Sequence, residues 1–149
     1  MENILKLKHS LSELFSTQRL AVLSSYGSEQ PYASLVAFAA TDDLKHIIFA
    51  TTRSTRKYTN LSQESKVALL IDNRTNDEKD FSYAVAATVL GKAEEVGSPQ
   101  KKEYLDIYLR KHPYLNEFVS SPSCALLTVS VEKYYIVTRF QNVQELHMS

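Results

Sequence analysis

The 149-residue chain balances 17 Lys and Arg residues against 17 Asp and Glu residues, so its formal net charge is zero. Proteins that bind nucleic acid or anionic membranes over a broad surface normally carry excess basic charge, so we expect neither partner. Hydrophobic residues make up 44% and charged residues 23% of the chain, as in ordinary soluble globular proteins. The length suits one domain over residues 1–149.

The numbers and positions of cysteine, glycine and histidine residues exclude several kinds of site. The one cysteine, Cys124, excludes an intrachain disulfide and suits a reducing, cytoplasmic location. Residues 1–17 are too charged for a signal peptide, and no apolar run is long enough to span a bilayer. Three glycines cannot form a dinucleotide fingerprint or a phosphate loop. The four histidines are scattered singly, so we expect no metal site.

Apolar periodicity predicts the elements of the first half of the chain. Apolar residues recur at helical spacing over residues 3–16 and predict an amphipathic helix. Short apolar runs between turn residues predict four strands, at 20–26, 32–40, 45–51 and 67–71. Residues 54–63 are polar, basic and compatible with a helix. Residues 73–82 form a long polar loop, either solvated or acting as a lid over a pocket.

The second half continues with strands and two helices. Residues 83–96 predict a long strand, and Ser98 as cap with Pro99 at the first helical position predicts a helix that stops before Pro113. A short helix is expected at 114–119. Two strand segments, 124–131 and 134–140, can also form one bent strand. Six or seven strands joined mostly by turns predict a mainly β (α+β) fold, an antiparallel sheet closed as a barrel with flanking helices.

The clearest chemical signal lies where the third strand ends and the next helix begins. A helix start exposes unpaired N–H groups and the positive end of the helix dipole, where acidic residues are favoured. This turn instead carries Arg53, Arg56 and Lys57. Hydroxyl groups line the same turn, at Thr51, Thr52, Ser54 and Thr55. The combination suits a phosphate site, and the alternative is a solvated basic turn with Ser54 as a plain helix cap.

The order of segments around this turn resembles the pyridoxamine 5'-phosphate oxidase-like family of flavin-binding split barrels. The matching segments are YASLV from Tyr32, FAT from Phe49, RSTRK from Arg53, KVALLID from Lys66 and VLGKAE from Val89. The resemblance covers roughly residues 10–131. It implies a six-stranded antiparallel split barrel that forms a homodimer, with FMN bound at the subunit interface.

The resemblance also implies which residues meet the cofactor. The FMN phosphate is expected at Thr51, Thr55, Arg56 and Lys57, with Arg53 and Ser54 between these anchors. The edge of the isoalloxazine ring is expected at Ser34, Leu35, Val36 and Ala37, largely through main-chain groups. Arg139 lies in an aromatic segment that is either an edge or interface strand, or brings Arg139 to the flavin or substrate of a partner subunit.

Two departures from the family pattern exclude vitamin B6 as the expected substrate. The chain has no tryptophan, and Ala86 stands where those oxidases place a glutamine against the flavin ring. We therefore expect a flavin-dependent oxidoreductase acting on another small molecule, with NAD(P)H as a candidate electron donor. The alternatives are a non-catalytic electron carrier or sensor, and a relative that binds deazaflavin or haem. Cys124, in an apolar strand, is expected to be a buried structural thiol.

Overall fold

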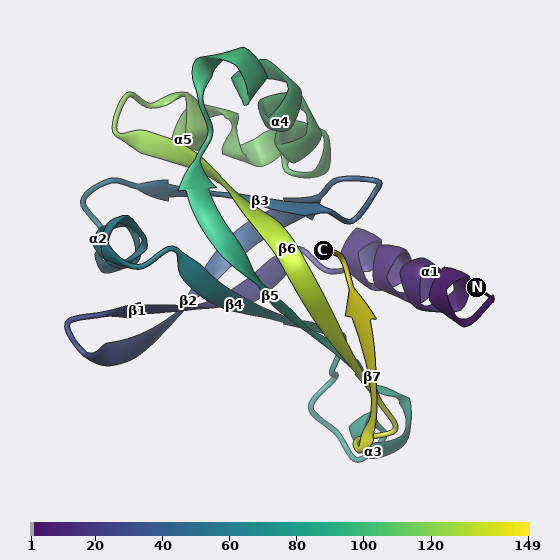
Figure 1. Cartoon of the computed structure of the whole chain (residues 1–149). Helices are drawn as coiled ribbons and strands as arrows, with labels where there is room; N and C mark the ends of the chain where they lie inside the picture. Colours follow the sequence, from purple (N-terminus) through teal and green to yellow (C-terminus); the bar gives the residue numbers. More distant parts are fainter. Residues whose placement is uncertain (1) are drawn as a thin grey trace.

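The computed structural model describes residues 2–149, which form a seven-stranded antiparallel sheet curled into a split barrel (Figure 1). The strand order is β3-β2-β1-β4-β5-β6-β7, and an additional pairing of β3 with β6 closes a ring of six strands. The strands are β1 (Leu20–Gly27), β2 (Gln30–Ala40), β3 (His46–Thr52), β4 (Lys66–Asp72), β5 (Val85–Glu95), β6 (Cys124–Thr138) and β7 (Asn142–His147). The predicted fold class is confirmed.

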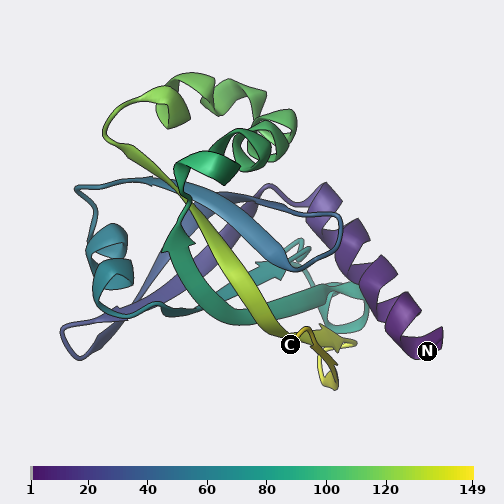
Figure 2. The same ribbon diagram turned by 45° about the horizontal axis from the view of Figure 1, so that its top comes forward.

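The helices lie around this ring. They are α1 (Glu2–Thr17), α2 (Arg56–Gln63), α3 (Asp80–Tyr83), α4 (Ser98–Lys111), the 3-10 turn η1 (Pro113–Leu115) and α5 (Asn116–Ser120). Both views place α1 and α2 on opposite sides of the barrel, with α4 and α5 over a third side (Figure 2).

Most predicted elements agree with the structure to within two residues. The last two predicted segments form one strand, β6, whose 15 residues run without a break. Strand β7 was not predicted, because only Leu146 of its six residues is buried and no apolar alternation marks it. Helix α3 begins in the predicted polar loop and ends at Tyr83, the first residue of the predicted strand 83–96. Gly97 rather than Ser98 caps α4, and Thr55 rather than Ser54 caps α2.

The main core fills the barrel and is sealed on one side by α1. The apolar stripe of α1 buries Leu7, Leu11, Leu14 and Phe15 against the strands. The Phe15 ring meets Phe38 of β2 edge to face, with ring centroids 5.7 Å apart. A second cluster lies outside the barrel, where Tyr108 of α4 and Val119 of α5 cover β2, β3 and β6. The outer face of this half of the sheet is therefore protected by helices.

Helix α2 docks onto the end of β1 through one polar contact. The Asn60 side chain is buried, and its Nδ2 donates to Ser25 Oγ over 3.2 Å. Gly27 supplies the space, because a Cβ at this position would overlap Asn60 Oδ1 and approach Asn60 Cα to 3.4 Å. Gly27 therefore sets how closely α2 approaches β1.

We expect Gly27→Ala to lower the free energy of unfolding by about 1–3 kcal/mol, because the added methyl group pushes α2 away from β1. Gly97→Ser is the matched control, since a Cβ at Gly97 meets only Pro99 Cδ at 3.8 Å and serine is a good helix cap. Urea denaturation measures both. Equal stability of the two variants would contradict the assigned role of Gly27.

Candidate functional site

The barrel is open between β2 and β3. These strands pair at only three positions, Phe38 with Phe49, Ala39 with Ile48 and Ala40 with Ile47. The preceding part of β2, residues 30–37, pairs with β1 on one edge only. The end of β3 pairs with β6 instead, as far as Thr52 opposite Cys124. We call the space between β2 residues 33–37 and the end of β3 the gap.

Main-chain groups of β2 face this gap. Phe38 N–H donates to Arg19 O on the β1 side over 3.2 Å, and successive residues of a strand direct their main-chain groups to opposite edges. The main-chain N–H and C=O groups of Ala33, Leu35 and Ala37 therefore point into the gap. The Ala37 carbonyl accepts a hydrogen bond from Tyr108 Oη of α4 over 3.1 Å. The gap thus offers a row of donors and acceptors without a partner strand.

The four predicted ring contacts on β2 separate into three groups. Leu35 and Ala37 face the gap with their main chain. The main-chain groups of Ser34 face β1, where Ser34 pairs with Leu23. Its side-chain Oγ is buried and has no hydrogen-bond partner among the described residues. Val36 packs its side chain in the core and pairs with Ala21 of β1. A buried hydroxyl without a partner is uncommon, which marks Ser34 as a group able to receive a ligand.

The start of α2 lies at the end of β3, and its turn is stabilised from within. Thr55 Oγ1 accepts from Tyr58 N–H over 3.3 Å and donates to Thr52 O over 2.8 Å. Thr51 Oγ1 lies 3.0 Å from Thr55 Oγ1. The hydroxyl protons of Thr51 and Thr55 are therefore used inside the turn. These two predicted residues thus stabilise the turn, and the side chain of Ser54 is exposed beside them.

Positive charge collects at this helix start. The first turn of α2 contains no acidic residue, and a helix leaves its first N–H groups without intrahelical partners. The Arg56 guanidinium lies 5.9 Å from the centroid of the Tyr32 ring on β2. Among the side chains of residues 3–149, neither Arg56 nor Lys57 forms an ion pair. Two cations and the free amides of the same turn are thus available to one anion.

Arg53 forms contacts that the sequence did not predict. Its Nη2 donates to Glu95 Oε2 over 2.6 Å, and its Nη1 donates to the carbonyls of Pro122 and Cys124 over 2.8 Å and 3.2 Å. Tyr58 Oη donates to Glu95 Oε1 over 2.8 Å. The Glu95 carboxylate, at the end of β5, therefore holds both Arg53 before the helix start and Tyr58 after it. Arg53 tethers the helix start, and we leave it out of the proposed phosphate contacts.

The Glu95 carboxylate stays ionised in this tether. Burial by itself raises the pKa of Glu95, but the hydrogen bonds from Tyr58 and Arg53, with the charge of Arg53, outweigh burial and lower its pKa. Sequence reasoning missed the tether, because nothing in the chain order pairs Arg53 with a residue at the end of a later strand.

Arg139 lies far from this turn in the same chain. It is exposed, has a φ of 50°, and forms the β6–β7 turn with Phe140, whose φ is 70°. Cys124, next to the helix start, and Thr138, next to Arg139, are opposite ends of the 15-residue strand β6. Within one chain, Arg139 therefore does not reach the gap. Cys124 itself is buried and unpaired, as expected.

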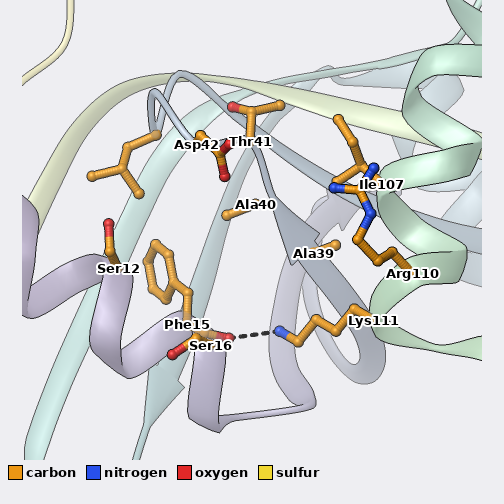
Figure 3. A pocket seen from close by; sticks show the side chains of 11 residues that line it. Ser12, Phe15, Ser16, Ala39, Ala40, Thr41, Asp42, Ile107, Arg110 and Lys111 are labelled. Carbon is orange, nitrogen blue, oxygen red and sulfur yellow. Dashed lines mark hydrogen bonds between the residues drawn. The ribbon is translucent and has the colours of Figure 1, made fainter.

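Two cavities lie near the C-terminal end of α4, one lined by its last turns and the other by His112 and η1, which follow it. A cavity of about 630 Å³ lies on the outer face of β1, β2 and β4, and its lining includes Leu35, Ala37, Arg19 and His112. It therefore shares two residues with the gap. A smaller cavity of about 370 Å³ lies between α1, the β2–β3 turn and α4 (Figure 3). None of the predicted cofactor residues lines the smaller one.

The family model for pyridoxamine 5'-phosphate oxidase matches residues 7–138 of the chain. The chain belongs to the pyridoxamine 5'-phosphate oxidase family. No curated protein matches it in sequence. Across residues 2–149, no helix is long and apolar enough to cross a membrane. Among the side chains of residues 3–149, no three His, Cys, Asp or Glu residues gather as metal ligands would.

Solved structures share the family fold at low identity. A haem-binding protein from Mycobacterium smegmatis gives a TM-score of 0.79 at 12% identity, over 89% of this chain and 54% of that one, so this chain spans about half of that protein. The General Stress Protein 26 from Bacillus anthracis gives a TM-score of 0.72 at 20% identity, and the match covers 95% of this chain and 98% of that one. A FAD-binding protein from Mesorhizobium loti gives a TM-score of 0.68 at 13% identity, and the match covers 86% of this chain and 91% of that one. At these identities the likeness shows the fold.

In this family member, His112 joins α4 to β2 beside the larger cavity. The imidazole is buried, and its Nε2 lies 2.6 Å from Phe38 O, which requires the Nε2–H tautomer. Burial and the charges of Lys111 and Arg19 lower the pKa of His112, although the bond to Phe38 opposes the shift. The folded protein therefore holds His112 neutral.

We expect the lowered pKa of His112 to make the free energy of unfolding depend on pH. Because the folded pKa of His112 is lowered from 6.5, its stabilising contribution is complete above that pH and is lost as pH falls toward the folded pKa. The free energy of unfolding should therefore decrease below pH 6.5, with a slope of at most about 1.4 kcal/mol per pH unit. Urea denaturation from pH 5 to 7 should show a shallower slope in His112→Gln. An identical slope would contradict this assignment.

Proposed function

We propose that this protein binds FMN in the gap, with the phosphate at the start of α2, and acts as a flavin-dependent oxidoreductase. One observation carries the proposal. Among the described side chains, Arg56 and Lys57 have no ion-pair partner at a helix start that has no acidic residue, beside the segment of β2 whose main-chain groups face the gap. Membership of the family supports a flavin as the group that uses both features.

The electrostatics of the turn support a phosphate ligand. A cation at a helix N-terminus costs a few tenths of a kcal/mol to about 1 kcal/mol, because the helix dipole repels it. A phosphate dianion reverses this penalty for Arg56 and Lys57 together. It also accepts from the free amides of their turn and lies next to the hydroxyls of Thr52 and Ser54. The Glu95 tether neutralises Arg53, so the free positive charge is confined to the helix start.

The remaining contacts concern the ring. We assign the ring edge to the main chain of Leu35 and Ala37 and to Ser34 Oγ, the buried hydroxyl without a partner. Bound FMN would supply the chemistry of hydride transfer, while the chain would hold and orient the ring and limit access of water. The cavity of about 630 Å³ shares Leu35 and Ala37 with the ring contacts, and we assign the substrate or an NAD(P)H donor to it.

FMN fits this chain better than FAD. The clamp suits a terminal phosphate, and three glycines provide no dinucleotide fingerprint. The haem-binding and FAD-binding relatives make both groups relevant competitors. The absorbance spectrum of the purified protein separates flavin from haem, and consumption of NADH or NADPH separates turnover from simple carriage of electrons.

We further propose a homodimer that completes the site. The outer face of β1, β2 and β4 exposes Leu20, Leu35 and Leu70, at 53%, 64% and 37% of their surfaces. Register places Val22 of β1 opposite both Leu35 and Leu70, so these side chains form one continuous apolar face. An exposed apolar face of this kind marks an interaction site. Because Leu20, Leu35 and Leu70 also line the cavity of about 630 Å³, a second copy on this face would turn that cavity into a site between the two subunits, and we assign the partner's Arg139 to it.

We expect Arg56→Gln/Lys57→Gln to weaken FMN binding by about tenfold to a hundredfold per lost charge, because each removes a charge-assisted contact to the phosphate. Riboflavin, which lacks the phosphate, should bind the variant and the wild type equally. Fluorescence titration with FMN, FAD and riboflavin measures this.

The matched control is Lys6→Gln/Lys8→Gln, which removes two exposed charges from α1. It should leave all three affinities unchanged, and thermal melts of both ligand-free variants should stay within about 0.5 kcal/mol of the wild type. Unchanged FMN affinity in a folded Arg56→Gln/Lys57→Gln protein would show that the turn is a solvated basic surface and does not bind the phosphate.

For the dimer, we expect Leu70→Asp to give a monomer at micromolar concentration, because it buries an unpaired charge at the interface. Leu5→Asp on α1, where the side chain is 62% exposed, should leave the dimer intact. Sedimentation equilibrium distinguishes the two. A wild-type protein that is monomeric with flavin bound would refute the proposed dimer.

A further inference from the structure

The smaller cavity has the features of a second ligand site. It measures about 370 Å³ and is lined by three elements that meet at the end of α4 (Figure 3). Phe15, Ala39, Leu44 and Ile107 give it an apolar floor, while Arg110, Lys111 and Asp42 are its charged groups. A concave apolar site with a few convergent polar groups is the usual form of a small-molecule pocket.

Lys111 is the most unusual group in this lining. Its Nζ donates to Phe15 O, near the end of α1, over 2.7 Å and lies 3.7 Å from the centroid of the Phe38 ring. The ammonium group has three donors, so this contact leaves two for other partners. Burial, with the charge of Arg19, lowers the pKa of Lys111 to about 8. The side chain is thus a half-buried cation that has no counter-ion among the described side chains.

The charge balance of the cavity selects one class of ligand. Among the side chains of residues 3–149, Arg110, Lys111 and Asp42 form no ion pair with one another or with other residues. Two cations and one carboxylate leave a single positive charge. A monoanion neutralises that charge, whereas a phosphate dianion would also meet the Asp42 carboxylate.

We propose that this cavity binds a small monocarboxylate with an apolar body, such as an aryl or short branched alkyl acid. The carboxylate pairs with Lys111 and Arg110, and the apolar body lies on Phe15, Leu44 and Ile107. The site is independent of the proposed flavin site, because the two share no lining residue. It therefore remains testable whether or not the protein binds FMN.

Benzoate is the probe, and benzyl alcohol is its neutral counterpart of similar size. We expect benzoate to bind the full-length protein with a Kd of about 1 mM or tighter, and benzyl alcohol to bind at least tenfold more weakly. Isothermal titration and NMR shifts of the α1 and α4 amides measure affinity and location. Equal affinity of the two probes, or no benzoate binding at 10 mM, would overturn the proposal.

Three variants locate the site. Lys111→Met should weaken benzoate binding at least tenfold, and Arg110→Gln, on the exposed rim, about threefold or more. Ser12→Phe fills the cavity from α1 without a change of charge and should abolish binding, so the test survives if Lys111→Met does not fold. Lys102→Gln, on the same helix but outside the cavity, is the matched control. Wild-type affinity in folded Ser12→Phe or Arg110→Gln would overturn the proposal.

Discussion

The short pairing of β2 with β3 is the constraint on which the rest of this structure depends. Strand β3 pairs with β6 along its whole length but with β2 at three positions only. The ring of strands therefore closes through β6, while half of β2 keeps one free edge. Helix α4 satisfies one main-chain group of this free edge through Tyr108, and the neighbouring groups of residues 33 and 35 have no partner strand.

The early separation of β3 from β2 also determines where Arg56 and Lys57 lie. Because β3 ends beside β6, the chain must cross the open end of the barrel before β4 begins, and α2 makes this crossing. Its contact with β1 depends on Gly27 and Asn60, and its first turn is held at Glu95. Local sequence gives the turn its charge, but strand topology places that charge next to the free edge of β2.

The sequence predicted the strands, the main helices and the chemical character of the Thr51–Lys57 turn, because these depend on local periodicity and on residue type at a helix start. It could not separate the functions of residues within the turn. Arg53 and Arg56 look equivalent in one dimension, yet the carboxylate that pairs with Arg53 is 42 positions away. Thr51 and Thr55 bond within the turn over three or four positions, but several hydroxyl residues stand in this turn and the sequence does not show which of them makes these bonds. Strand β7 was missed because it forms by pairing with β6 and buries little.

The cap at Thr55 has a consequence for kinetics. Its hydroxyl already accepts from Tyr58 N–H and bonds the Thr52 carbonyl, so the amides of this turn are oriented in the free protein. The phosphate group that we propose for this position would not need to order a loop, and little conformational entropy would be lost on association. Association of such a ligand should then be limited by diffusional encounter and accelerated at low ionic strength.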